Sequence, residues 1–182
     1  MERCRMVFSG SGGQGVITAA VILAEAAVIV EGLNATQSQS YGAAARGGST
    51  RTDIIISDSV IHYPKVIQPN VLVCLTQEAY GQYSGIIRPG GLLLLDNRYV
   101  QPEKKVDARQ VALSMHKTVM EKIGKPIVFN ICMLGALIKI TDLVKPESIM
   151  TILEKRIPAG FVDMNRAALE LGMELAAEYA PG

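Results

Sequence analysis

The sequence predicts an α/β fold with three layers, α/β/α, built on a Rossmann-like, mostly parallel mixed sheet with a helical C-terminal region. Three observations support this. An apolar run breaks into glycines over residues 7–15 and leads into a long apolar segment, as in a strand, a tight turn and a helix. Residues 71–76 and 92–95 are continuous apolar runs, typical of parallel strands covered on both faces. Apolar residues at helical spacing fill the C-terminal part.

The first elements follow from the glycine turn. We expect a strand at 3–9 and a helix at 15–31, which Gly32 ends because glycine adopts the left-handed conformation common after helices. The helix is apolar almost all round, which predicts burial on more than one face, within the domain or against another subunit. Residues 33–40 carry alternating polar side chains and predict a second strand.

The middle of the chain alternates between strands and a helix. Two runs on either side of Asp58 and Ser59 predict a β-hairpin. The predicted elements are hairpin strands at 50–57 and 60–63, a strand at 71–76, a helix at 77–87, and a strand at 92–95 followed by Asp96.

The C-terminal part is predicted to be helical, at 108–123, 129–140, 145–157 and 161–179. Asn130 is the expected N-cap of the second of these helices. We expect the last helix to pack on the sheet through its apolar side, which carries Phe161, Met164, Ala168, Leu171 and Leu175.

Size and charge limit the possible functions. With 182 residues, of which 49% are hydrophobic, the chain fits a single domain, residues 1–182. The formal net charge of +1 argues against a general nucleic-acid binder. No uncharged apolar run approaches the roughly 20 residues of a membrane span, and no signal peptide is recognisable, so we expect a cytoplasmic chain. Its three cysteines form no C-x-x-C pair, so we expect no metal or iron–sulfur site.

The glycine turn is the first candidate site. Gly10, Gly12 and Gly15 satisfy G-x-G-x-x-G, and Gly13 adds a fourth glycine. Glycines let a ligand approach the backbone, and a helix start suits a phosphate or carboxylate. NAD in its usual pose is disfavoured because residues 36–40 offer no carboxylate to a ribose. A P-loop is disfavoured because no Lys follows the turn.

Five further residues complete the candidate site. Gln14 can donate or accept at the turn, or simply face solvent. Arg46, beside Gly47 and Gly48, can grip a phosphate with its guanidinium, or else pair with a surface acid. Asp96 follows a strand, where α/β sheets place ligand groups, although a turn or helix-cap acceptor is the alternative. We expect these residues and the four glycines to bind a cofactor, and we find no catalytic set.

Several motifs occur together, in order, along almost the whole chain. They are GSGGQGV at 10–16, ILAEAA at 22–27, QSYGAAARGGST at 39–50, ISD at 56–58, TQEAY at 76–80 and PGG at 89–91. The combination resembles the gamma subunit, or gamma domain, of 2-oxoacid:ferredoxin oxidoreductases, in particular the 2-oxoglutarate (KorC-like) type. One departure is that residues 42–46 lack the Pro and the acid that relatives often carry before Ala-Arg-Gly-Gly.

The resemblance implies oxidative decarboxylation of a 2-oxoacid, such as 2-oxoglutarate or pyruvate, with coenzyme A, giving acyl-CoA and reduced ferredoxin. It also implies partners: alpha and beta subunits and, in some members, a ferredoxin-like delta subunit. These would carry thiamine diphosphate, magnesium and iron–sulfur clusters. This chain has neither a G-D-G…N segment nor a cysteine cluster, so we expect a non-redox subunit that is inactive alone.

The glycine segments then have two possible uses. The turn at 10–15, with Arg46, would suit the pyrophosphate or 3′-phosphate of coenzyme A; alternatively, these segments pack against another subunit. We favour the ligand for 10–15 and the interface for 41–49. The alternative function is an independent nucleotide- or CoA-binding module, which would bind its ligand without redox partners.

Overall fold

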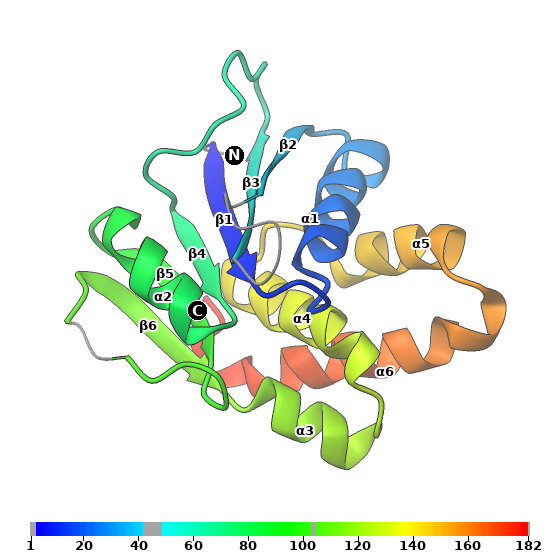
Figure 1. The fold of residues 1–182 in the computed structure, drawn as a ribbon. Coiled ribbons are helices and arrows are strands. Elements are labelled where there is room, and N and C mark those ends of the chain that lie inside the picture. The colour runs from blue at the N-terminus through cyan, green and yellow to red at the C-terminus, as the bar shows by residue number, and fades with distance from the viewer. Residues whose placement is uncertain (1–2, 42–48, 103–104, 182) are drawn as a thin grey trace.

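The computed structural model describes residues 3–41, 49–102 and 105–181. A six-stranded sheet runs through its centre in the order β2-β3-β1-β4-β5-β6 (Figure 1). β1, β4, β5 and β6 are parallel to one another, whereas β3 runs antiparallel to both β1 and β2. The expected mixed, mostly parallel sheet is therefore confirmed. The strands are β1 (Cys4–Gly10), β2 (Asn34–Tyr41), β3 (Thr50–Ser57), β4 (Val71–Cys74), β5 (Gly91–Asp96) and β6 (Ala108–Leu113).

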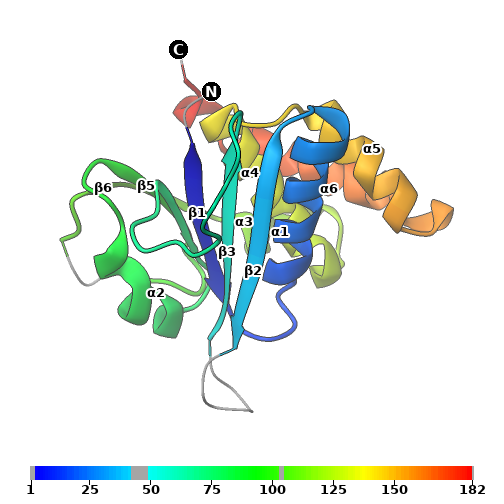
Figure 2. The same ribbon diagram turned by 90° about the horizontal axis from the view of Figure 1, so that it is seen from above.

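Helices cover the two faces of the sheet unequally (Figure 2). α2 lies on one face, while α1 and α4 lie on the other, with α5 and α6 beyond them. In the described ranges, no helix is long and apolar enough to cross a membrane. The helices are α1 (Val16–Glu25), α2 (Gln77–Tyr83), α3 (Met115–Lys122), α4 (Phe129–Thr141), α5 (Pro146–Arg156) and α6 (Val162–Leu175).

Each central strand contributes to two hydrophobic cores. In β1, Met6 and Phe8 belong to the larger core beneath α1 and α4, and Val7 belongs to the smaller core beneath α2. β4 and β5 divide their side chains in the same way. Successive side chains of a strand point to opposite faces, so burial on both faces requires apolar residues at every position. This accounts for the continuous apolar runs in the sequence.

The connections that follow β1 and β4, two neighbouring parallel strands at the centre of the sheet, lead in opposite directions along the sheet. After β1 the chain passes through α1, on the larger-core face, towards β2. After β4 it passes through α2, on the opposite face, towards β5. The carboxyl ends of two neighbouring parallel strands whose connections diverge in this way form the usual ligand crevice of an open α/β sheet. The glycine turn follows β1 at this point.

Two predicted elements in the first half need correction. The predicted hairpin of 50–57 with 60–63 is wrong: β3 pairs with β2 and β1, and residues 58–70 form no helix or strand. Pairing with two neighbours buries β3, which outweighs the local turn signal at Asp58. The helix predicted at 15–31 becomes α1 followed by a π-helical segment, Ala26–Val30, and Gly32 has the expected positive φ of 70°.

The helix predicted at 108–123 is wrong over its first half. Ala108–Leu113 is β6, a strand parallel to β5, and the helix begins only after Ser114. Helical spacing of a few apolar residues could not reveal this strand, because its partner on the sheet decides the conformation. Asn130 is also not an N-cap: the cap position of α4 is Val128, and no side chain bonds the first amides.

α6 packs on α4 rather than on the sheet, contrary to the prediction. Two glycines, Gly135 of α4 and Gly172 of α6, bring the helices into backbone contact. A Cβ on Gly172 would overlap the carbonyl oxygen of Cys132, and one on Gly135 would overlap that of Leu169. Small residues at a crossing permit this close approach.

We therefore expect Gly172→Ala to lower the free energy of unfolding by about 1–3 kcal/mol, the usual cost of overpacking. Urea unfolding followed by circular dichroism measures it. Gly85→Ala is the control, because a Cβ at Gly85 meets no atom within 4 Å. Equal stability of the two variants would contradict the packing described here.

Candidate functional site

Two glycines of the turn are required by their close neighbours. A Cβ on Gly10 would lie 2.5 Å from Oε1 of Gln14. Gly15 has a φ of 72°, and its Cβ would lie 2.6 Å from Nδ2 of Asn130 at the start of α4. At Gly15 the positive φ and the contact with Asn130 both require glycine, whereas a side chain at Gly10 would displace the Gln14 side chain from the turn.

The other two glycines of the turn face open space. A Cβ on Gly12 or Gly13 would meet nothing within 4 Å, and both residues are exposed. Glycine at Gly13 is favoured by its φ of 89°, whereas no contact in the described part of the chain requires glycine at Gly12. The outer side of the turn is therefore bare backbone, accessible to a ligand or to another chain.

Gln14 ties the turn to the neighbouring strand. Its Oε1 accepts a hydrogen bond from the amide of Ser11 at 2.8 Å, and its Nε2 donates to the carbonyl of Leu75 at 3.0 Å. Because Leu75 directly follows β4, Gln14 bridges the crevice between β1 and β4. Its side chain thus fixes the turn rather than pointing into solvent.

The first turn of α1 presents its amides without a capping side chain. Gly15 occupies the N-cap position and has no side chain to offer. The first amides of a helix have no acceptor within the helix and carry a partial positive charge. An anion at this end of α1 would find the unpaired amides and open glycines together.

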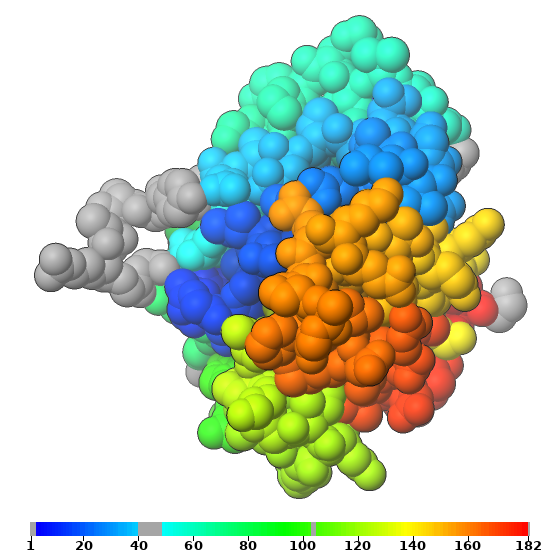
Figure 3. Space-filling model, turned by 90° about the vertical axis from the view of Figure 1, so that its right-hand side faces the viewer, coloured from blue at the N-terminus to red at the C-terminus, as the bar shows by residue number. Residues whose placement is uncertain are grey.

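A groove of about 450 Å³ lies beside the turn. Figure 3 shows the start of α1, the segment between α5 and α6, and the residues before α4 adjoining on one face. The lining is mainly apolar, and Ile127 and Phe161 remain 78% and 54% exposed at the surface. The lining residues are Gly13, Gly15, Thr18, Ile22, Ile127, Val128, Asn130, Ile131, Leu153, Ile157, Pro158, Phe161, Met164 and Asn165.

Asn130 is the unusual polar group of this groove. The residue is only 6% exposed, and its Nδ2 donates to the carbonyl of Gly15 at 3.2 Å. Its Oδ1 is buried and accepts no hydrogen bond in the described part of the chain. A buried acceptor without a partner costs about 1–3 kcal/mol.

The carboxylate of Asp96 is occupied by hydrogen bonds to the backbone. Its side chain is fully buried, Oδ1 accepts from the amide of Arg98 at 2.9 Å, and Oδ2 accepts from the amide of His116 at 2.8 Å. Burial raises the pKa of this carboxyl, and the backbone hydrogen bonds from His116, Arg98 and Met115 oppose this rise only in part. These contacts match the turn and helix-cap alternative, because they join the end of β5 to the start of α3.

Arg46, Gly47 and Gly48 lie outside the described residues. The strands that flank this segment place its two ends. Tyr41 pairs with Thr50, and Thr50 in turn pairs with Gly10. Ser9 Oγ also donates to the Thr50 carbonyl at 3.0 Å. The described residues Tyr41 and Thr50 therefore lie next to the start of the glycine turn.

The sequence prediction missed the groove. Its lining comes from α1, the residues before α4, and the ends of α5 and α6, which only the fold brings together. Asn130 does carry a signal, as an amide at the head of an otherwise apolar helix, but by itself this position indicates a cap.

Known proteins resemble this chain over nearly its full length. Residues 5–175 match the family model of pyruvate ferredoxin/flavodoxin oxidoreductases. The 2-oxoglutarate synthase subunit KorC of Methanocaldococcus jannaschii is 42% identical over 93% of this chain and 92% of its own.

Solved structures agree with this relationship. The gamma subunit of a keto/oxoacid ferredoxin oxidoreductase from Geobacter sulfurreducens is 39% identical, with a TM-score of 0.86 over 96% of this chain and 99% of that one. The 2-oxoglutarate:ferredoxin oxidoreductase of Magnetococcus marinus, solved with 2-oxoglutarate, coenzyme A and succinyl-CoA bound, shares the fold. Its TM-score is 0.88 at 20% identity, over 98% of this chain and 32% of that one. The chain described here belongs to the pyruvate ferredoxin/flavodoxin oxidoreductase family and is a gamma subunit.

Proposed function

We propose that this gamma subunit supplies a coenzyme A contact to a thiamine diphosphate-dependent 2-oxoacid:ferredoxin oxidoreductase and is inactive alone. The complex would convert a 2-oxoacid to acyl-CoA and carbon dioxide while reducing ferredoxin. The observation that carries the proposal is the uncapped glycine turn, open at Gly12 and Gly13, beside an apolar groove that Asn130 helps to line. Alpha, beta and, in some complexes, delta subunits would carry the redox groups.

Coenzyme A has the chemistry that this arrangement calls for. Its phosphates are anions that can accept hydrogen bonds from the amides at the start of α1 and from the open backbone at Gly12 and Gly13. Its pantetheine chain offers apolar surface to the groove. Arg46 would add a guanidinium to the phosphates. In this role the subunit binds and orients, and it moves no proton or electron.

The cysteines support the assignment of iron–sulfur clusters to other subunits. A cluster needs several thiolates close together. Cys74 belongs to the smaller core, on the opposite face of the sheet from Cys4 and Cys132. Burial raises the pKa of Cys4 to about 11 and those of Cys74 and Cys132 to about 12, which opposes thiolate formation. The described ranges also hold no group of three His, Cys, Asp or Glu residues suited to a metal ion.

The competing use of the turn is contact with another subunit and no ligand. Bare glycines would serve a close chain-to-chain contact equally well. The apolar groove beside the turn favours the ligand, because it offers a place for the apolar body of a bound molecule next to the open backbone.

In the assembled complex, we expect Gly12→Asp to raise the apparent KM for coenzyme A at least tenfold and to leave the KM for the 2-oxoacid unchanged. The added carboxylate would repel a phosphate at the turn, while the open space at Gly12 lets the chain fold. Steady-state kinetics with each substrate varied in turn measures both constants.

Gly85→Asp is the matched control for this substitution, because Gly85 also meets open space but lies after α2, on the opposite face of the sheet. An unchanged KM for coenzyme A in Gly12→Asp would refute the proposed contact. Loss of assembly instead would favour the subunit interface. Arg46→Ala extends the test to the neighbouring segment and should also weaken coenzyme A binding.

We expect Cys74 and Cys132 to resist Ellman's reagent at pH 8 in the folded chain. With a pKa of about 12, the thiolate fraction at that pH is about a thousandfold below that of an ordinary thiol. Denaturation should make all three thiols reactive. Rapid labelling of Cys74 or Cys132 in the folded chain would contradict the burial on which the exclusion of a cluster is based.

A further inference from the structure

Residues 58–70 form an irregular segment at the end of the strands that is opposite the glycine turn. It runs from the end of β3 to the start of β4. Asn70 Oδ1 accepts from the amide of Arg5 at 2.9 Å, beside the start of β1, and the amide of Arg88 donates to the Pro69 carbonyl at 3.1 Å. The segment therefore begins and ends at the amino ends of the parallel strands, away from the proposed coenzyme A contact, and its middle folds back over β3.

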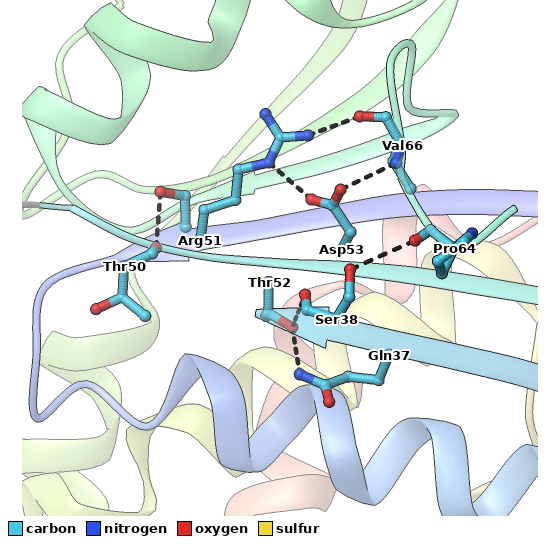
Figure 4. Close-up of polar contacts among 9 residues, drawn as sticks. Gln37, Ser38, Thr50, Arg51, Thr52, Asp53, Pro64 and Val66 are labelled. Atoms are coloured by element: carbon cyan, nitrogen blue, oxygen red, sulfur yellow. Dashed lines mark hydrogen bonds and ion pairs between the residues drawn. The ribbon is translucent and has the colours of Figure 1, made fainter. Parts of the chain in front are cut away.

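A buried ion pair holds this segment in one conformation (Figure 4). Asp53 is 2% exposed, and its Oδ1 accepts from Arg51 Nε at 2.7 Å. Its Oδ2 accepts from the amide of Val66 at 2.9 Å, and Arg51 Nη2 donates to the Val66 carbonyl at 2.6 Å. Both backbone groups of Val66 are thus bound, and its side chain is buried in the smaller core. A fixed Val66 turns its neighbours, Lys65 and Ile67, outward.

The outward side of the segment is both apolar and basic. Val60, Tyr63 and Ile67 are 62%, 62% and 76% exposed. A hollow of about 590 Å³ beside them is lined by three cations and by no carboxylate among the described residues. The cations are Arg5, Lys65 and Arg88, from the start of β1, from the segment itself and from the loop before β5. The chain as a whole is close to neutral, with a net charge of +1, so this concentration of positive charge is local.

We propose that this surface, formed by Arg5, Tyr63, Lys65, Ile67 and Arg88, binds a carboxylate-rich segment of another subunit of the oxidoreductase complex. Aromatic, aliphatic and arginine side chains around a hollow are the composition of protein interface centres. A small anion would leave Tyr63 and Ile67 uncovered. A symmetric contact with a second copy would bring the same cations together, at a cost in repulsion. The inference depends on the proposed assembly with partner subunits.

The test compares wild-type chain with the double variant Lys65→Glu, Arg88→Glu in binding to the remaining subunits of the complex. Both side chains are exposed, so the variant should fold, and its circular dichroism and melting temperature verify this. We expect the dissociation constant to rise at least tenfold. Wild-type binding should weaken as salt is raised, because salt screens exposed charges. Lys122→Glu, Lys155→Glu is the control, with the same charge change at exposed lysines elsewhere.

The outcomes are distinct. Unchanged affinity of the Lys65, Arg88 variant, with wild-type assembly intact, would overturn this inference and leave the proposed function standing. An equal loss in both double variants would also overturn it, because net charge alone would then explain the result. A wild-type chain that binds none of the subunits would overturn the proposed function as well. A dimer of the isolated chain that Ile67→Ser dissociates would assign the surface to a second copy and refute the proposal.

Discussion

The contact between Gly15 and Asn130 decides how the candidate site is built. Only a residue without a Cβ fits there, because a Cβ on Gly15 would lie 2.6 Å from Nδ2 and 2.8 Å from Cγ of Asn130. The close approach lets Nδ2 reach the Gly15 carbonyl and leaves Oδ1 buried, with no partner in the described part of the chain. The start of α4 is thereby held against the start of α1, and the turn and groove become one site. A larger residue at 15 would separate them.

The two ends of the parallel strands have different characters. At the carboxyl ends, open glycines, uncapped amides and an apolar groove form a surface suited to an anionic ligand with an apolar body. At the amino ends, a hollow lined by exposed apolar and basic side chains is suited to another protein. The Arg51–Asp53 ion pair, on β3 beside Ser9 and Val7 of β1, fixes Val66 next to this hollow. The sheet between them separates the two surfaces, so a subunit of this size can contact a ligand at one end and a partner at the other.

Local sequence is sufficient for elements whose environment is uniform. The apolar runs predict β4 and β5, because a strand buried on both faces needs apolar residues at every position. The glycine pattern predicts the turn, because left-handed backbone favours glycine. β6 and the pairing of β3 depend on distant strands and are missed for that reason. The groove is assembled from four separated parts of the chain, so no local pattern could show it. Gln14 and Asp96 stand out in the sequence, but the contacts that fix them are tertiary.

The central claim is that the glycine turn meets coenzyme A. Hydrogen–deuterium exchange of the assembled complex, with and without coenzyme A, tests it most directly. We expect slower exchange of the amides from Gly12 to Thr18 when coenzyme A is added, because a bound phosphate would accept their hydrogen bonds. Amides that are already protected by assembly and do not respond to coenzyme A would contradict the claim, and would show that the turn is covered by a neighbouring subunit.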